Sequence, residues 1–251
     1  MGEINITDLE FSYQRGGPPV VSRISLGIAH GEFVAIVGPN GCGKTTFLRL
    51  LSGLLLPSAG TVAIDGRPPT EATIGFIVQN FAESLFPWAT VRENVLFPFS
   101  LKVRATQAGY GGHRLEEQIA RLGIKLPLEK YPYEISGGQQ QLTAIVRSLL
   151  YEPDVLLLDE PFSGLDVTTR RRMQDTLLAL REHTPLTAVF VTHDIDEALY
   201  MADRIIMFTP LPARLAGSTA VPFARPRDRS IVRTMEFSLM RTEVDSRVFP
   251  E

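Results

Sequence analysis

Cysteine is almost absent from this sequence. Its 251 residues include a single cysteine, Cys42, which excludes an intrachain disulfide and a cysteine-rich zinc site. Such low cysteine usage fits a reducing compartment. We therefore expect a cytosolic chain.

Long hydrophobic runs are also missing. No apolar run approaches the ~18–20 residues that a membrane-spanning helix needs. The first residues, Met1-Gly2-Glu3-Ile4, lack the basic and then apolar pattern of a secretory signal peptide. We expect a chain that neither spans a membrane nor is secreted.

An excess of positive charge is missing as well. The 25 lysines and arginines are outnumbered by 28 aspartates and glutamates, which gives a net charge of -3. Proteins held mainly by nucleic-acid phosphates carry a basic excess. We therefore expect no nucleic-acid partner.

What the sequence does contain is an alternation of apolar strand patterns with helical patterns. Runs rich in β-branched and aromatic residues predict strands at 33–37, 61–64, 74–78, 155–158, 188–191 and 205–208. Apolar residues at three- and four-residue spacing predict helices at 44–53, 139–151, 168–183 and 194–202. Several strands are apolar on both faces, which favours a parallel sheet covered on two sides. The predicted fold class is α/β.

The same patterns predict three parts of the chain. Residues 1–80 and 154–210 carry the strands of a core, whereas 81–153 have helical patterns only and predict an inserted helical subdomain. Residues 211–251 predict a C-terminal appendage that ends in a helix. Its arginine-rich stretch, Arg225 to Arg229, includes Asp228, so we expect a solvated surface rather than a site for anionic lipid.

A glycine-rich loop follows the first core strand and precedes a helix. It fits the pattern Gly, four residues, Gly-Lys-Ser/Thr. Its residues are Gly38, Pro39, Asn40, Gly41, Cys42, Gly43, Lys44, Thr45 and Thr46. In such a loop backbone N–H groups surround phosphate oxygens, Lys44 reaches the terminal phosphates and Thr45 ligates Mg²⁺. The loop predicts a nucleoside triphosphate site.

Two further segments have the chemistry to complete that site. Asp159 and Glu160 end a buried strand, where α/β sheets place their ligands. Asp159 suits a Mg²⁺ ligand and Glu160 suits a general base. The segment Ser136-Gly137-Gly138-Gln139 starts a helix and predicts either ordinary capping or a second anion site.

Taken together, these segments resemble the ATP-binding subunit of ABC transporters over nearly the whole chain. The resemblance rests on motifs in the family's order: the Walker A loop 38–46, Gln79 after a strand, the signature 135–139, the Walker B end Asp159-Glu160, the stretch 163–166, and His193. It implies a P-loop NTPase (RecA-like) core with a mostly parallel sheet, an N-terminal antiparallel β portion and an inserted α-helical subdomain.

The resemblance also implies roles for single residues. Tyr13 stacks on adenine, unless it is a core aromatic. Gln79 completes the Mg²⁺ and water site, and His193 hydrogen-bonds the γ-phosphate. Asp166 helps to align the site of a partner chain, and Gln139 belongs to the signature that faces it.

The implied partners follow from the same family. Two chains, identical or homologous, pair head to tail, so that Ser136, Gly137 and Gly138 contact ATP bound by the other chain. A membrane permease docks on an apolar cluster that includes Phe81, Leu85, Phe86, Pro87 and Trp88; the alternative for this cluster is subdomain core. The implied location is the cytoplasmic face of the inner membrane, and the implied cofactors are ATP and Mg²⁺.

The branch of the family is indicated by three stretches, 86–95, 192–199 and 225–229, which are similar to the nitrate, sulfonate and taurine importers. A substrate-binding protein would then act indirectly, through the permease. The alternative is an ATP-gated clamp that moves no solute.

Two positions depart from the family pattern. Leu142 replaces a common arginine, and Cys42 replaces a common serine. Because the loop before a helix and Lys44 favour a thiolate, we expect a lowered pKa and fast labelling at Cys42.

Overall fold

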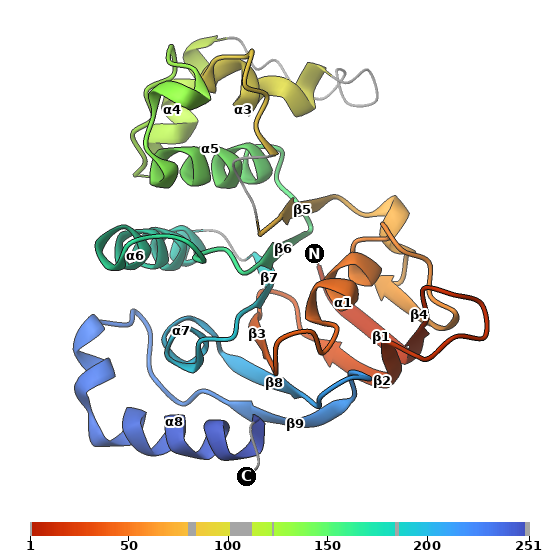
Figure 1. Ribbon diagram of the computed structural model, residues 1–251. Helices are drawn as coiled ribbons and strands as arrows, with labels where there is room; N and C mark the ends of the chain where they lie inside the picture. The colour runs from red at the N-terminus through yellow and green to blue at the C-terminus, as the bar shows by residue number, and fades with distance from the viewer. Residues whose placement is uncertain (1, 80–83, 101–111, 122, 184–185, 249–251) are drawn as a thin grey trace. The chain divides into compact units, whose positions relative to one another are not determined.

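The structure is a computed structural model that describes residues 2–79, 84–100, 112–121, 123–183 and 186–248 (Figure 1). The described residues form two compact units. The first lies within residues 1–76, 154–161 and 185–251, and the second within residues 77–153 and 162–184. Within the described ranges, no helix is both long and apolar enough to cross a membrane.

The centre of the first unit is a six-stranded sheet with the order β5-β6-β7-β3-β8-β9. Its strands are β3 (Phe33–Val37), β5 (Ile74–Ile77), β6 (Val155–Asp159), β7 (Thr187–Val191), β8 (Arg204–Phe208) and β9 (Leu215–Ala220). The pairs β6/β7, β7/β3 and β3/β8 are parallel, and β9 runs antiparallel to β8. Every residue of β3, β6 and β7 is buried. The predicted α/β class with a mostly parallel sheet is confirmed.

A second sheet in this unit is antiparallel and has the order β2-β1-β4. Its strands are β1 (Ile4–Phe11), β2 (Val21–Ile28) and β4 (Ala59–Ile64). Apolar residues that alternate with polar ones along β1 point into a core shared with α1 (Lys44–Leu51). In that core the ring of Phe47 meets the ring of Phe208 edge-on at 5.1 Å. The expected N-terminal antiparallel portion is confirmed.

The C-terminal part of the chain packs on the same unit. It contains β9, the short 3₁₀ helix η3 (Arg229–Arg233) and α8 (Met235–Val248). Both η3 and α8 pack against α7 (Ile195–Met201), as Figure 1 shows in blue and cyan. The strand β9 was not predicted, because its sequence Leu215–Ala220 is made mainly of small residues and lacks an alternation of large apolar and polar side chains.

The second unit is helical. It contains α3 (Val91–Ser100), α4 (Gly112–Arg121), η2 (Pro132–Glu134), α5 (Gly137–Leu149) and α6 (Val167–His183); the other short 3₁₀ helix, η1 (Pro69–Glu71), belongs to the first unit. Helix α5 packs against α3 and α6.

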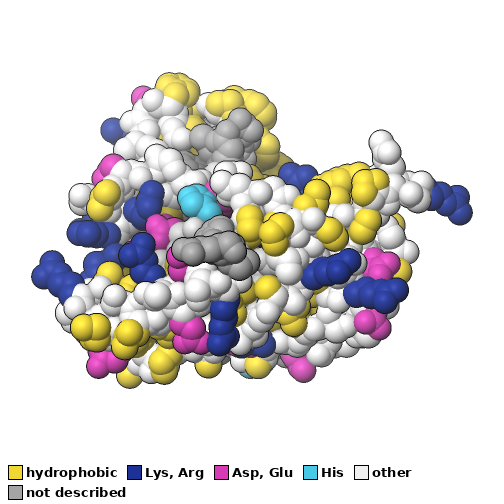
Figure 2. Space-filling model, turned by 60° about the horizontal axis from the view of Figure 1, so that its bottom comes forward, with side chains coloured by type: hydrophobic (Ala, Val, Ile, Leu, Met, Phe, Trp, Pro, Cys, Tyr) yellow, Lys and Arg dark blue, Asp and Glu magenta, His cyan; other side chains and the backbone are white. Residues whose placement is uncertain are grey.

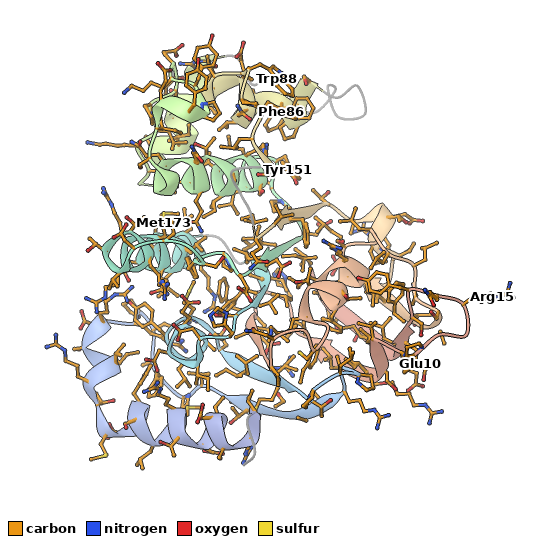
Figure 3. The ribbon with its side chains drawn as sticks, in the orientation of Figure 1. Glu10, Arg15, Phe86, Trp88, Tyr151 and Met173 are labelled. Carbon is orange, nitrogen blue, oxygen red and sulfur yellow. The ribbon has the colours of Figure 1, made fainter. Side chains whose placement is uncertain are left out.

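An aromatic cluster lies beside α3 (Figure 3). The ring of Phe86 lies 4.4 Å from that of Phe97 and 5.4 Å from that of Trp88, while Leu85 is buried. Trp88 is 76% exposed. Phe81, which we placed in the same cluster, lies outside the described residues.

Candidate nucleotide site

The glycine-rich loop joins β3 to α1, as the sequence predicts. Gly43 caps α1 with a φ of 113°, and a Cβ there would lie 3.0 Å from the carbonyl oxygen of Val20. Only glycine takes that conformation without strain. The turn brings the Lys44 side chain back over the loop, where its Nζ donates hydrogen bonds to the oxygens of Gly38 (2.8 Å) and Pro39 (3.0 Å).

The burial of Lys44 is unusual for a lysine. Its side chain is 6% exposed, although lysine is almost never buried unless it is paired. Two carbonyl oxygens carry only partial negative charge, so an anion beside the ammonium group would be strongly favoured. The loop is therefore suited to an anionic ligand. Of its other members Gly38 is buried, whereas Asn40 and Gly41 are exposed.

The second predicted element meets the loop directly. The hydroxyl of Thr45 donates a hydrogen bond of 3.0 Å to Oδ1 of Asp159, the last residue of β6. Asp159 is 4% exposed, and burial is the main reason why its pKa is raised. The bond from Thr45 opposes that shift, and the nearby charge of Glu160 adds to it. Because burial disfavours the ionised carboxylate of Asp159, a cation bound beside it would be favoured.

Glu160 and His193 lie together at the same edge of the sheet. His193 Nδ1 is 3.3 Å from Glu160 Oε1, and the Glu160 side chain is 17% exposed. The backbone of Glu160 has a φ of 43° and its N–H donates to Val191 O at 3.0 Å. A left-handed glutamate is uncommon and is often found at functional sites. The two residues follow β6 and β7, so parallel pairing accounts for their meeting.

Tyr13 is also close to this site. Its hydroxyl lies 3.0 Å from Thr46 Oγ1, its ring meets Phe11 edge-on at 4.9 Å, and 60% of the residue is exposed. A tyrosine so exposed is not a core aromatic.

The expectation for Cys42 is wrong. Cys42 is 1% exposed and belongs to the hydrophobic core. Its Sγ would be 3.1 Å from a Cβ placed on Gly38, so the thiol points inward. Burial raises the pKa of Cys42 and outweighs the lowering effect of Lys44. We predicted a lowered pKa because the sequence does not tell on which side of the loop the sulfur lies.

The remaining predicted residues belong to the second unit. Ser136 caps α5 by accepting the N–H of Gln139 at 3.4 Å, while the Gln139 side chain accepts the N–H of Ser136. Ser136 and Gly137 are exposed. A Cβ on Gly138 would lie 2.5 Å from the Thr169 methyl group on α6. Glycine is needed here because the two helices approach closely.

Two more predicted residues of this unit are exposed. Asp166 accepts hydrogen bonds from the N–H groups of Thr168 and Thr169, at 3.0 and 3.1 Å. A hydrogen bond from the Thr169 hydroxyl and those from the backbone lower the pKa of Asp166. Gln79 follows β5 and is exposed.

Some residues that support the site were missed by the sequence analysis. The hydroxyl of Thr192 donates a hydrogen bond of 2.8 Å to the Glu197 carboxylate, and both side chains are buried. The same Thr192 oxygen accepts the N–H of Asp194 at 3.0 Å. These bonds fix the loop that carries His193. The acidic run 194–197 was the available signal, but its spacing resembles an ordinary helix start.

The expected solvated surface is wrong for part of the arginine-rich stretch, because Arg227 is buried, whereas Pro226 and Asp228 are exposed. Arg227 is 8% exposed and donates to backbone oxygens of α7. Figure 2 shows basic side chains in groups at the left and right of the surface, with acidic side chains beside several of them.

Comparison with known proteins places this geometry in a family. The model of the family described as "ABC transporter" matches residues 21–163. An aliphatic sulfonates import ATP-binding protein of Bacillus thuringiensis is 38% identical over 243 residues, which are 96% of this chain and 93% of that protein. The nitrate import ATP-binding protein NrtC of Synechococcus elongatus is 40% identical over 239 residues; the chain spans 36% of its length.

Solved structures agree with this. A dimeric ATP-binding cassette in a post-hydrolysis state with ADP and Pi bound has a TM-score of 0.73 at 30% identity, over 88% of this chain and all of that one (100%). The protein cbiO1 of Clostridium perfringens, part of an ABC transporter complex, has a TM-score of 0.75 at 27% identity, over 95% of this chain and 96% of that one. The chain belongs to the ABC transporter family, and its fold is that of the family's ATP-binding cassettes.

Proposed function

We propose that the chain is the ATP-binding and ATP-hydrolysing subunit of a bacterial ABC importer for a small solute of the nitrate, sulfonate and taurine type. The observation that carries the ATPase part is the convergence of Lys44, the Thr45–Asp159 pair and the Glu160–His193 pair. They lie at the ends of adjacent strands β3, β6 and β7. Ligands of open α/β sheets bind at that edge.

Magnesium fits the oxygen atoms present. Thr45 Oγ1 and Asp159 Oδ1 are hard ligands 3.0 Å apart, of the kind that Mg²⁺ prefers. Among the described residues there is no group of three or more His, Cys, Asp or Glu side chains able to hold a metal alone. The nucleotide phosphates would supply further ligands. When bound, Mg²⁺ would neutralise charge on the β- and γ-phosphates.

The hydrolytic step is assigned to Glu160. Its carboxylate takes a proton from water as the water oxygen bonds to the γ-phosphorus, and the bond from that phosphorus to the bridging oxygen of ADP breaks. The contact with His193 orients the carboxylate. His193 would also donate a hydrogen bond to the γ-phosphate, and Lys44 would stabilise the developing charge. Tyr13 is proposed to stack on the adenine ring.

A second chain is proposed to complete each site. Ser136, Gly137, Gly138 and Gln139 lie at the start of α5, where N–H groups and the helix dipole favour an anion. The exposure of Ser136 and Gly137 supports a partner's nucleotide as the ligand. The dimeric form of the solved cassette with ADP and Pi supports such pairing. Asp166 is assigned to alignment of the partner's site, and Gln79 is assigned to completing the Mg²⁺ and water site.

Gel filtration with Mg-ATP tests the composite site. Glu160→Gln keeps the side-chain shape and loses the base, so the ATP-bound dimer should accumulate. Adding Ser136→Arg to Glu160→Gln should abolish that dimer and leave ATP binding to the single chain intact. A dimer that persists with Ser136→Arg contradicts the role of the signature.

The importer part is supported by relatives named for nitrate import and sulfonate import. A membrane permease is proposed to dock at the exposed aromatic side chains Trp88 and Phe97, 76% and 39% exposed. Such aromatic anchors are favoured at protein interfaces. The chain would then sit at the cytoplasmic face of the membrane, and a binding protein would select the solute.

Co-purification from solubilised membranes tests this part. A polytopic membrane protein that is recovered with the wild-type chain, and lost with Trp88→Ala, is the expected result. Recovery of soluble partners only would favour an ATP-gated clamp that moves no solute.

A further inference from the structure

Arginines of the C-terminal segment converge on one end of helix α7. Arg227 Nη1 donates to the backbone oxygens of Leu199 (3.1 Å) and Tyr200 (2.9 Å). Arg225 Nη2 donates to the oxygen of Met201 at 2.6 Å, and its Nε donates to Asp203 at 3.0 Å. Three successive carbonyl groups at the C-terminal end of α7 thus accept hydrogen bonds from guanidinium groups.

Two further arginines hold the sides of the same helix. The guanidinium of Arg229 lies over the ring of Tyr200, 4.4 Å from its centre. Arg241 of α8 forms an ion pair of 3.0 Å with Asp196, in the first turn of α7. All four arginines come from residues 225–241, and all four contact α7.

The carbonyl groups at the C-terminal end of α7 explain why arginines gather there. The last carbonyl groups of a helix have no partner within the helix, and positive charge near them is favourable. One guanidinium can donate to several oxygens in a fixed geometry. Because Arg227 is 8% exposed and its protons are directed to backbone oxygens, this group is not presented to lipid.

The opposite end of α7 carries the loop of His193. Asp194 caps the helix by accepting the N–H groups of Asp196 (2.9 Å) and Glu197 (3.2 Å). Glu197, inside α7, accepts a hydrogen bond from the hydroxyl of Thr192. The residues on both sides of His193 are therefore bonded to α7, and a displacement of this helix displaces the histidine.

We propose that the C-terminal arginines, chiefly Arg227, are positioning residues for the ATPase reaction: they fix α7, and through Thr192 and Asp194 they hold His193 against Glu160. This inference rests on the proposed ATPase function. It gives residues 225–241 a role in hydrolysis rather than in ATP binding, since none of the contacts just described involves the loop 38–46 or Tyr13.

The test combines hydrogen exchange with kinetics on the full chain. Arg227→Lys keeps the charge and loses the two-oxygen geometry. Backbone amides of 192–201 should exchange about 10-fold faster, because this segment opens more often, while amides of 44–51 should keep the wild-type rate. For Mg-ATP hydrolysis, kcat should fall about 10-fold with KM within about twofold, as expected when a group acting in the transition state is misplaced.

Controls separate positioning from general loss of structure. Arg247→Lys alters an arginine of α8 whose partner is Glu243 on the same helix, 2.8 Å away, and it should change neither readout. In a His193→Ala chain, Arg227→Lys should lower kcat no further, since its effect acts through the histidine. If Arg227→Lys yields no folded protein, Arg241→Gln at the exposed ion pair should show the same pattern with a smaller, about twofold, effect.

The outcomes that overturn the inference are distinct from failure of the proposed function. Unchanged exchange at 192–194, equal acceleration at 44–51, or an undiminished kcat would each refute the positioning role. A wild-type chain without ATPase activity in its membrane complex would refute the proposed function; faster exchange at 192–194 would then still show that Arg227 holds the loop.

Discussion

The substitution Asp159→Asn should stabilise the chain without nucleotide and remove its response to Mg-ATP. Burial raises the pKa of Asp159 above that of an unfolded chain, near 3.9. The stabilising effect of the protonated form is therefore complete below the unfolded pKa and is lost as the pH rises through the folded pKa. At neutral pH the ionised carboxylate destabilises the folded chain.

The magnitude follows from the environment of Asp159. The side chain is 4% exposed and receives one hydrogen bond from Thr45. Removing such a buried charge while keeping the side-chain size should raise the free energy of unfolding by about 1–2 kcal/mol. A domain of this size gains about 2–4 °C in Tm per kcal/mol.

With Mg-ATP bound, the wild-type chain should become more stable than the Asp159→Asn variant. A ligand at 100 times its Kd adds about 2.7 kcal/mol to the wild-type chain, whereas the variant lacks the carboxylate proposed to hold Mg²⁺ and should gain less. The assay is the Tm by calorimetry, at pH 7 and pH 5, with Mg-ATP and with ATP plus EDTA. The stabilising effect of the substitution should shrink at the lower pH.

Asp65→Asn is the matched control, with the same change of charge. Burial raises the pKa of Asp65, but hydrogen bonds from the N–H groups of Gly2 and Glu3 outweigh it and leave the pKa lowered. The ionised carboxylate of Asp65 therefore stabilises the folded chain at pH values above the unfolded pKa, and this effect is lost as the pH falls through the folded pKa. The Asp65→Asn variant should lose stability at pH 7 and keep the full response to Mg-ATP. An Asp159→Asn chain that is less stable without ligand, or equally stabilised by Mg-ATP, would contradict the proposed role of Asp159 as a buried Mg²⁺ ligand.

Three further predictions concern the loop and the signature. Cys42 should react with maleimide at least about 10-fold more slowly than a free thiol at pH 7, because burial restricts access and raises its pKa; a mass-spectrometric time course that shows rapid labelling would contradict its inward orientation. Lys44→Ala should weaken the binding of a fluorescent ATP analogue by about 1.5–3 kcal/mol, and unchanged affinity would remove Lys44 from the phosphate site. Gly138→Ala should lower the free energy of unfolding by about 1 kcal/mol, since a clash of about 1–3 kcal/mol with the Thr169 methyl group outweighs the helix propensity of alanine; Thr169→Ser in the same chain should restore stability in urea titration, and no rescue would mean that the contact is not the cause.

Much of the nucleotide site could be predicted from the sequence, because its parts are local. The loop from Gly38 to Thr46 is one continuous segment between a strand and a helix, so its pattern defines its geometry. The meeting of Asp159, Glu160 and His193 depends only on neighbouring parallel strands that end at one edge. The apolar patterns of these buried strands were therefore sufficient to predict that the three residues meet.

The remaining features depend on long-range packing. Cys42 lies in a predicted loop, yet the direction of its sulfur is set by the core beneath Gly38. Arg227 is 26 residues beyond the end of α7 (227 − 201), and no periodicity in a segment rich in proline and arginine shows which carbonyl groups it reaches. Strand β9 lacks the apolar alternation of a half-buried strand and forms because β8 offers an edge.

Release of phosphate from Mg-ATP by the chain in complex with its membrane partner tests the proposed ATPase function most directly. The wild-type chain should release equal amounts of ADP and Pi and none in EDTA, and the rate should be at least about 100-fold lower with Glu160→Gln at equal ATP occupancy. Turnover by Glu160→Gln at the wild-type rate, or no Pi from a wild-type complex saturated with Mg-ATP, would contradict this proposal.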